Sequence, residues 1–298
     1  MALEQLDLRG MLETAVVAAR LAGQKAMEEL DFLKVSVKND SELVTQADSQ
    51  CQQIIVDRIK EAYPDHGFIA EEGSGGKLFK QSPRLTPTPV FRQENVGVAG
   101  ADEPIWWVID PIDGTNNFAR KILIFSVSIA AFYKNEPVVG AIFEPATDSM
   151  FTAIKGDEAQ LNGRRITASE DTMNKFSSIG LDSGFEQSPT LQSYGDGAEL
   201  PGWVQEVMRR TRFRSLGSIA LHIAYVAKGG FIGTIGSSQK LWDIAAGVVI
   251  AEAAGAIVTD WQGKKIFPVD LDSYTSQQFQ TITANKKTHA QILELLRS

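Results

Sequence analysis

Two aspartates at the end of one apolar run are the residues in this sequence that point most directly to chemistry. Asp110 and Asp113 follow the run Trp106–Ile109, with Pro111 between them and Gly114 directly after. Proline fixes its own φ, and glycine lets the backbone approach a ligand closely. Carboxylates gathered beside an apolar element are typical of a cation site. A structural turn between a strand and a helix is the alternative explanation.

The residue after this turn adds an anion to the expectation. If a helix begins near Thr115, the backbone N–H groups of Gly114 and Thr115 point at whatever anion lies there. This segment therefore favours a metal ion together with a phosphate group.

Three further segments carry acids that could join the same site. Glu71 and Glu72 end the short apolar run Gly67–Ala70. If this strand neighbours the one before Asp110, the two acidic ends converge, and α/β sheets bind ligands at such ends. Asp48 and Asp243 lie at the expected starts of two helices. The alternative role for each is to cap its helix or to complement the helix dipole.

A set of carboxylates favours a hard ion such as Mg²⁺ over zinc, which usually takes nitrogen or sulfur ligands. His66, His222 and His289 have no metal-ligand spacing, so we expect them at the surface or in the core. The sequence has no P-loop, no GxGxxG and no GxSxG motif that would indicate a different chemistry.

Helices and an antiparallel sheet are expected to position the acids of the first half. Apolar residues recur at helical spacing over residues 6–30, and a second helix is predicted over about 45–62. β-branched and aromatic runs at 125–133, 137–144 and 149–155 are separated by turns, and Asn162-Gly163 is typical of a hairpin. We predict an α+β unit over residues 1–165.

The second half, residues 166–298, alternates strands and helices and is predicted to be an α/β unit that contributes Asp243. The predicted strands cover 177–181, 213–215, 231–235, 255–259 and 280–284. The predicted helices cover 203–210, 217–227, 241–254 and 288–296.

Two long segments have no clear pattern. Ser74–Pro104 is predicted to be a long loop or a small excursion, and Asp182–Pro201 a second irregular loop. Long loops in compact domains are often functional. The first one carries the basic residues Lys77, Lys80, Arg84 and Arg92, so it could close over a phosphorylated ligand. A solvated insertion with no chemical role is the alternative.

Composition limits the class of protein. The 298 residues have a net charge of −8, which argues against broad, non-specific binding of nucleic acid. The single Cys51 cannot form an intramolecular disulfide, the N-terminus is too polar for a secretory signal, and no apolar run reaches the roughly 20 residues of a membrane span. We expect a soluble, cytoplasmic protein.

The segments Trp107–Arg120 (WVIDPIDGTNNFAR) and Trp242–Ala256 (WDIAAGVVIAEAAGA) resemble the two signatures of the inositol monophosphatase family. Members of that family are Mg²⁺-dependent, lithium-sensitive phosphatases of sugars and nucleotides. Three other landmarks follow in the family's order: 43–48, 69–72 and 214–218. The resemblance covers the whole chain and implies a layered αβαβα fold of the inositol monophosphatase and fructose-1,6-bisphosphatase type.

The resemblance also implies a role for each acid. Glu71, Asp110 and the carbonyl of Ile112 resemble the ligands of a first Mg²⁺. Asp110, Asp113 and Asp243 resemble those of a second, and Glu71 with water would hold a third.

Other positions resemble the family's catalytic and substrate-binding residues. Gly114 and Thr115 look like its phosphate cradle. Asp48 and Thr115 resemble the pair that orients a metal-bound water, with Glu72 close by. Lys38 lies one residue from the position expected for the active-site lysine. A metal ion lowers the pKa of a bound water, which then attacks phosphorus without a covalent intermediate.

The substrate is expected to depend on the second half and the loops. Members that act on inositol phosphate typically carry an acid seven residues before the aspartate of the second signature, where this chain has Gly236. Lys240 offers a cation instead, unless it is a surface lysine. A sugar bisphosphate, a nucleotide 3′(2′),5′-bisphosphate, histidinol phosphate and an inositol-phosphate-like substrate all stay open. A weakly active regulatory binding protein is the alternative from another class, and the resemblance implies a homodimer.

Overall fold

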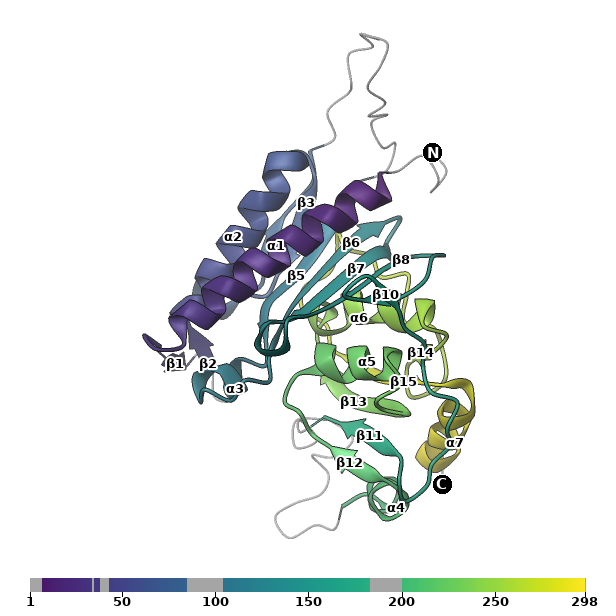
Figure 1. The fold of residues 1–298 in the computed structure, drawn as a ribbon. Helices are drawn as coiled ribbons and strands as arrows, with labels where there is room; N and C mark the ends of the chain where they lie inside the picture. Colours follow the sequence, from purple (N-terminus) through teal and green to yellow (C-terminus); the bar gives the residue numbers. More distant parts are fainter. Residues whose placement is uncertain (1–6, 34, 38–42, 85–103, 183–199, 298) are drawn as a thin grey trace.

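Helices and sheets alternate in five layers in the computed structural model (Figure 1). The structure describes residues 7–33, 35–37, 43–84, 104–182 and 200–297. Lys38 and most of the two predicted loops therefore lie outside the described residues. The layered α+β fold expected from the sequence is confirmed.

The first layer consists of α1 (Leu8–Glu29) and α2 (Gln46–Ala62), which cover one face of the larger sheet. Both predicted helices are confirmed. Small residues on α1 allow a close approach: a Cβ at Gly23 would lie 2.6 Å from the Phe143 ring of the sheet. Between the two helices, β1 (Val35–Val37) and β2 (Leu43–Thr45) form an antiparallel pair, and Thr45 leads directly into α2.

The larger sheet has eight strands in the order β10-β9-β8-β7-β6-β5-β3-β4. In chain order the strands are β3 (Gly67–Ala70), β4 (Phe79–Gln81), β5 (Ile105–Asp113), β6 (Ser126–Tyr133), β7 (Glu136–Glu144), β8 (Ser149–Ile154), β9 (Gln160–Leu161) and β10 (Arg164–Arg165). Strands β6 to β8 form the antiparallel sheet that was predicted over 125–155, and β5, β9 and β10 extend it with further antiparallel pairs. The predicted hairpin at Asn162-Gly163 is confirmed, because β9 and β10 pair across it.

Strands β3 and β5 are parallel neighbours, with Ala70 opposite Ile109. Both strands therefore end at the same edge of the sheet, and Glu71 and Asp110 follow at that edge. The predicted convergence of the two acidic strand ends is confirmed.

The segment Ser74–Pro104, predicted to be a long loop or a small excursion, contains regular structure at its start. Residues 74–76 form a 3-10 turn, and Phe79–Gln81 form β4, which pairs antiparallel with β3. Three half-buried residues are too short a run to stand out from sequence alone. The chain leaves β4 beside Gly67, and β5 also begins there, since Trp106 lies opposite Gly67. Both described ends of the connection between β4 and β5 therefore lie at the sheet edge away from Glu71 and Asp110.

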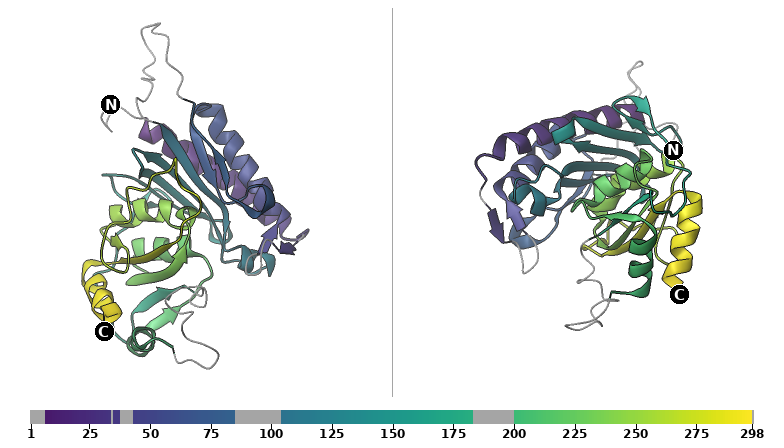
Figure 2. Two further views of the ribbon diagram at one scale, coloured as in Figure 1. Left: turned by 180° about the vertical axis from the view of Figure 1, so that it is seen from behind. Right: turned by 60° about the horizontal axis from the view of Figure 1, so that its bottom comes forward.

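The middle layer consists of α5 (Ile219–Ala227) and α6 (Leu241–Ala253), which lie between the two sheets (Figures 1 and 2). Helix α6 is apolar on almost all sides because it is covered on both faces. It touches β7 closely: a Cβ at Gly140 would lie 2.5 Å from the Ala246 carbonyl oxygen.

The second sheet has the order β12-β11-β13-β15-β14. In chain order its strands are β11 (Ser178–Leu181), β12 (Arg212–Arg214), β13 (Gly233–Gln239), β14 (Ile257–Thr259) and β15 (Phe279–Ala284). The strand predicted at 231–235 begins later and runs on to Gln239. Its polar end was not apparent from the sequence, because its hydrogen bonds go to the distant residues Asp182 and Thr281.

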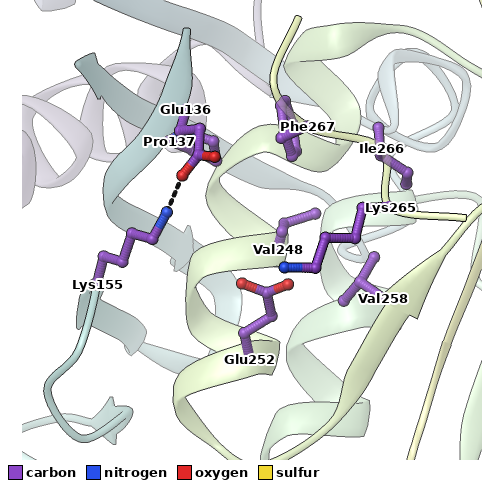
Figure 3. A pocket seen from close by; sticks show the side chains of 9 residues that line it. All are labelled: Glu136, Pro137, Lys155, Val248, Glu252, Val258, Lys265, Ile266 and Phe267. Carbon is purple, nitrogen blue, oxygen red and sulfur yellow. Dashed lines mark hydrogen bonds and ion pairs between the residues drawn. The ribbon is translucent and has the colours of Figure 1, made fainter. Parts of the chain in front are cut away.

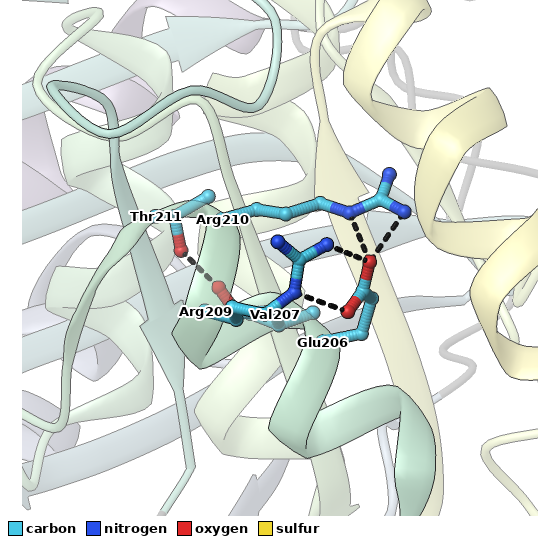
Figure 4. A network of polar contacts seen from close by, with 5 residues as sticks. All are labelled: Glu206, Val207, Arg209, Arg210 and Thr211. Carbon is cyan, nitrogen blue, oxygen red and sulfur yellow. Dashed lines mark hydrogen bonds and ion pairs between the residues drawn. The ribbon is translucent and has the colours of Figure 1, made fainter.

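The outer layer consists of α4 (Gly202–Arg210) and α7 (Lys286–Arg297), on the far side of the second sheet (Figure 2). Helix α4 ends in two arginines, and both donate to the Glu206 carboxylate (Figure 4). No helix in the described ranges is long and apolar enough to cross a membrane.

The two halves share one of the hydrophobic cores. Ile69 and Trp106 of the larger sheet belong to the same buried cluster as Trp242 and Ile250 of α6. All strands of the larger sheet precede residue 166, and all strands of the second sheet follow it. The division into units 1–165 and 166–298 stays a proposal.

Candidate active site

Asp110 lies at the centre of the candidate site. Its side chain is only 2% exposed, and its Oδ1 accepts the Ile112 N–H at 3.0 Å, which turns the end of β5. Burial raises the pKa of Asp110 well above its usual range, and the negative charges of Glu71, Asp113 and Asp243 raise it further. Carboxylates from three separate segments therefore lie close enough to influence one another's charge.

Asp243 shows the same effect from the second half of the chain. Burial raises its pKa well above the usual range, followed by the charges of Asp113 and Glu71. Its Oδ2 also accepts the Lys240 N–H at 2.7 Å, so the acid caps α6 as well as facing the other carboxylates. Capping of α6 and participation in a cation site are therefore compatible roles for Asp243.

Asp113 is held by the start of α5. Its Oδ2 accepts hydrogen bonds from the Ser218 hydroxyl and, at 2.8 Å, from the Ala220 N–H. The Ile219 N–H lies 3.3 Å from Oδ1. Burial raises the pKa of Asp113 to about 6, although these bonds oppose the shift. The helix N-terminus suits a carboxylate because its N–H groups have no partners within the helix.

Asp48 has two sets of partners. Its Oδ2 accepts the backbone N–H and the hydroxyl of Thr45, at 2.7 and 2.6 Å, which caps α2 as predicted. Its Oδ1 lies 3.3 Å from the Thr115 hydroxyl. Burial raises the pKa of Asp48 to about 6, against the bonds from Thr45. The carboxylate is thus placed to accept a hydrogen bond from the Thr115 hydroxyl.

The turn after β5 brings Gly114 and Thr115 to the start of α3 (Thr115–Ala119), as the sequence predicted. Gly114 has a φ of 100°, in the left-handed region, and a Cβ there would lie 3.1 Å from the carbonyl oxygens of Gly217 and Ile124. Glycine is therefore required for both conformation and space. The Thr115 hydroxyl also lies 3.0 Å from the Ile112 carbonyl oxygen. Because α3 has only five residues, its dipole contributes little to anion binding.

Gln52 is a site residue that the sequence analysis missed. It lies one helical turn after Asp48 and is buried. Its Oε1 accepts the Glu72 N–H at 2.9 Å, and its Nε2 donates to the Glu72 carbonyl at 2.6 Å. Gln52 thus fixes the backbone of the Glu71-Glu72 pair from α2. The four-residue spacing from Asp48 was the available signal, since both side chains lie on the same face of the helix.

The carboxylate oxygens are the type of ligand that a hard divalent cation prefers, but their present positions do not form a complete coordination site. The charges of Glu71 and Asp113 raise the pKa of both Asp110 and Asp243, so the four carboxylates form an anionic cluster, and a cation would relieve their repulsion. Within the described parts of the chain, however, no three His, Cys, Asp or Glu side chains already have the geometry to hold a metal ion. Binding of an ion would therefore require these side chains to move from their present positions.

The predicted substrate residues lie close to the acids along the chain but have structural partners. Lys240 donates from Nζ to the Ser276 carbonyl at 2.9 Å. At Gly236 a Cβ would lie 2.2 Å from the Gln239 side chain, which in turn donates to Asp182 at 3.0 Å. Asp182, at the end of β11, therefore brings a carboxylate near the position where the sequence lacks one. It also raises the pKa of Asp243 slightly, as the last of several causes.

A surface pocket lies elsewhere, between α6, the start of β7 and the residues after β14 (Figure 3). Lys155 and Glu136 form an ion pair at its rim, while Glu252 and Lys265 line the other side. None of the predicted site residues lines this pocket.

Comparison with known proteins decides the family. The model of the inositol monophosphatase family matches residues 7–298. This chain belongs to the inositol monophosphatase family. It is 34% identical over 257 residues to the protein named Nus factor SuhB of Escherichia coli K12, covering 85% of this chain and 86% of the relative.

Solved structures of the family agree with the fold. The extragenic suppressor protein SuhB of Bartonella henselae superimposes with a TM-score of 0.77 at 27% identity, covering 97% of this chain and 99% of that one. The IMPase of Thermotoga maritima gives a TM-score of 0.75 at 28% identity, covering 97% of each chain.

Proposed function

We propose that this protein is a Mg²⁺-dependent phosphomonoesterase that hydrolyses a small phosphorylated metabolite. The observation that carries the proposal is the cluster of Glu71, Asp110, Asp113 and Asp243. Burial raises the pKa of its three aspartates, and for Asp110 and Asp243 the charges of the neighbouring acids raise it further. Strongly perturbed carboxylates of this kind are typical of functional sites. Membership of the inositol monophosphatase family supports phosphate ester hydrolysis as that role.

The four acids and the Ile112 carbonyl would hold two or three Mg²⁺ ions. Bound Mg²⁺ supplies neutralisation of phosphate charge and a more acidic water. The chain's own residues would orient the attacking water and the phosphate group. Thr115 can donate its hydroxyl proton to Asp48 Oδ1 and then accept a hydrogen bond from water at Oγ1. The left-handed φ of Gly114 sets the direction of the backbone N–H groups at the start of α3, which would meet a phosphate oxygen.

The substrate class within the proposal is a small molecule with one or two phosphates. Lys240 keeps its bond to Ser276 and still has donors to spare, because an ammonium group carries three N–H bonds. It can therefore meet a second negative charge. Sugar bisphosphates, nucleotide bisphosphates, histidinol phosphate and inositol-phosphate-like compounds are the classes to compare, and a homodimer in the cytoplasm stays our expectation.

The test is phosphate release from a panel of these compounds with Mg²⁺, for wild type, Asp110→Asn and the exposed control Asp57→Asn. We expect Asp110→Asn to lower kcat at least about 100-fold, because the central carboxylate is lost, while Asp57→Asn stays at wild-type rate. Excess chelator should abolish activity. Full activity of Asp110→Asn, or activity in chelator, would refute the mechanism.

A second candidate is a binding protein with little catalysis. Relatives that are 33% and 34% identical to this chain carry the name Nus factor SuhB, which states a factor and no enzymatic activity. If wild type releases no phosphate from any compound in the panel, this second role replaces the first.

A further inference from the structure

The segment Leu216–Ser218, between β12 and α5, brings the second half of the chain to Asp113. Ser218 donates its hydroxyl to Asp113, and the first N–H groups of α5 follow directly. The position of this segment therefore determines where the Asp113 carboxylate lies.

The Leu216 peptide is held from both sides. Its carbonyl accepts Asn117 Nδ2 of α3 at 2.6 Å, and its N–H donates to His222 Nε2 of α5 at 2.9 Å. Gly217 follows with a φ of 74°, and a Cβ there would lie 2.8 Å from Asn117 Nδ2. The segment is therefore pressed against the turn after β5, with no room for a side chain.

His222 is fully buried, and its other ring nitrogen lies 3.4 Å from the Thr234 hydroxyl. Because Nε2 accepts a hydrogen bond, the ring must be neutral with its proton on Nδ1. Burial supports that state, since it lowers the pKa of His222 to about 4. The nearby Phe231 ring, 5.9 Å away, and Gly180 complete an apolar pocket for the imidazole.

We propose that His222 is a positioning residue for the candidate active site: by holding the Leu216 N–H, it fixes the segment that places Ser218 and the first turn of α5 on Asp113. The role rests on the proposed function only in so far as Asp113 takes part in hydrolysis. His222 itself touches neither the acids nor a substrate. The competing explanation is a buried histidine that contributes to stability alone.

His289 provides a matched control for that explanation. It is also a buried histidine, with a ring nitrogen 2.8 Å from the Thr259 hydroxyl and a pKa lowered by burial. It lies in α7, in the outer layer, and its hydrogen bonds join it to Thr259 and to the Asn285 carbonyl.

The experiment compares His222→Leu, His222→Gln and His289→Leu in the full chain. Hydrogen exchange of the Leu216 amide and the backbone amide shifts of residues 217–220 are measured by NMR, alongside kinetics with Mg²⁺. His222→Leu should speed exchange at Leu216 and lower kcat, each by about tenfold or more, because it leaves that N–H without an acceptor. His222→Gln offers Oε1 as an acceptor and should restore most of both. His289→Leu should lower the melting temperature only.

Unchanged exchange at Leu216 in His222→Leu would overturn the proposal. An equal loss of kcat in His289→Leu would also overturn it, because stability alone would then explain the effect. If wild type has no phosphatase activity, the proposed function fails, whereas the exchange and shift measurements still decide whether His222 holds the segment.

Discussion

Asp110 shows how a single residue can favour function at the expense of stability. It is buried at the end of β5 among acids of the same sign, and its pKa is raised by that burial and by those acids. A buried carboxylate in such surroundings disfavours the folded, ionised state unless a cation compensates it.

We predict that Asp110→Asn stabilises the metal-free protein at high pH. The folded-state pKa of Asp110 lies above its unfolded value, so its contribution to stability falls as the pH rises through that interval. Asparagine removes the charge and can keep the bond to Ile112. In chelator at pH 8 the free energy of unfolding should rise by roughly 1–3 kcal/mol, with little change near pH 4. Urea unfolding at both pH values measures this, with Asp57→Asn as control. A loss of stability at pH 8 would contradict it.

The acidic residues of the site and the convergence of Glu71 with Asp110 could be predicted from the sequence, because both follow from short segments of the chain. Strand ends marked by Glu71 and Asp110 have to converge once their strands pair in parallel. The partners of Asp113 could not be predicted, since Ser218 lies more than a hundred residues away and reaches it only when the layers pack. The cap that Asp243 forms on α6 was an expected alternative role, but residue type did not reveal that Lys240 donates to the Ser276 carbonyl.

At the scale of elements, α2 fixes two parts of the site with one face. Asp48 reaches Thr115, and Gln52, one turn later, holds Glu72. A helix is a rigid support, so this face sets the distance between the turn after β5 and the end of β3.

We predict that Gln52→Leu impairs the site more than the fold. It leaves the N–H and carbonyl of Glu72 without their partner, which should cost about 1–3 kcal/mol in unfolding free energy. It should also lower kcat/KM, because the Glu71-Glu72 backbone is freed. Gln53→Leu is the control, since Gln53 is exposed on the same helix. Thermal unfolding and phosphatase kinetics of both variants are the measurements. Equal kinetics for the two would show that Gln52 does not position the acids.

At the scale of the whole molecule, the site depends on how closely α6 lies on the larger sheet. Asp243 belongs to α6, whereas Glu71, Asp110 and Asp113 belong to the sheet or its edge. Gly140 sets that approach, because its missing side chain lets β7 touch the Ala246 carbonyl.

We predict that Gly140→Ala moves α6 away from the sheet. The new methyl group would meet a backbone oxygen that cannot rotate aside, so the free energy of unfolding should fall by about 1–3 kcal/mol. Activity should fall as well, because Asp243 moves with the helix. Gly202→Ala is the matched control, with no atom within 4 Å of the new Cβ. Calorimetry and kinetics check both effects. A Gly140→Ala variant as stable and active as Gly202→Ala would contradict this account.

The parallel pairing of β3 and β5 also has a consequence for protein engineering. The connection that leaves β4 re-enters the sheet beside Gly67 and Trp106, a strand's length from Glu71 and Asp110. The hydrogen bonds between β3 and β5, rather than the length of this connection, hold the two acidic ends together. We therefore expect that a reporter or an affinity tag introduced directly after Arg84 leaves the geometry at Glu71 and Asp110 unchanged.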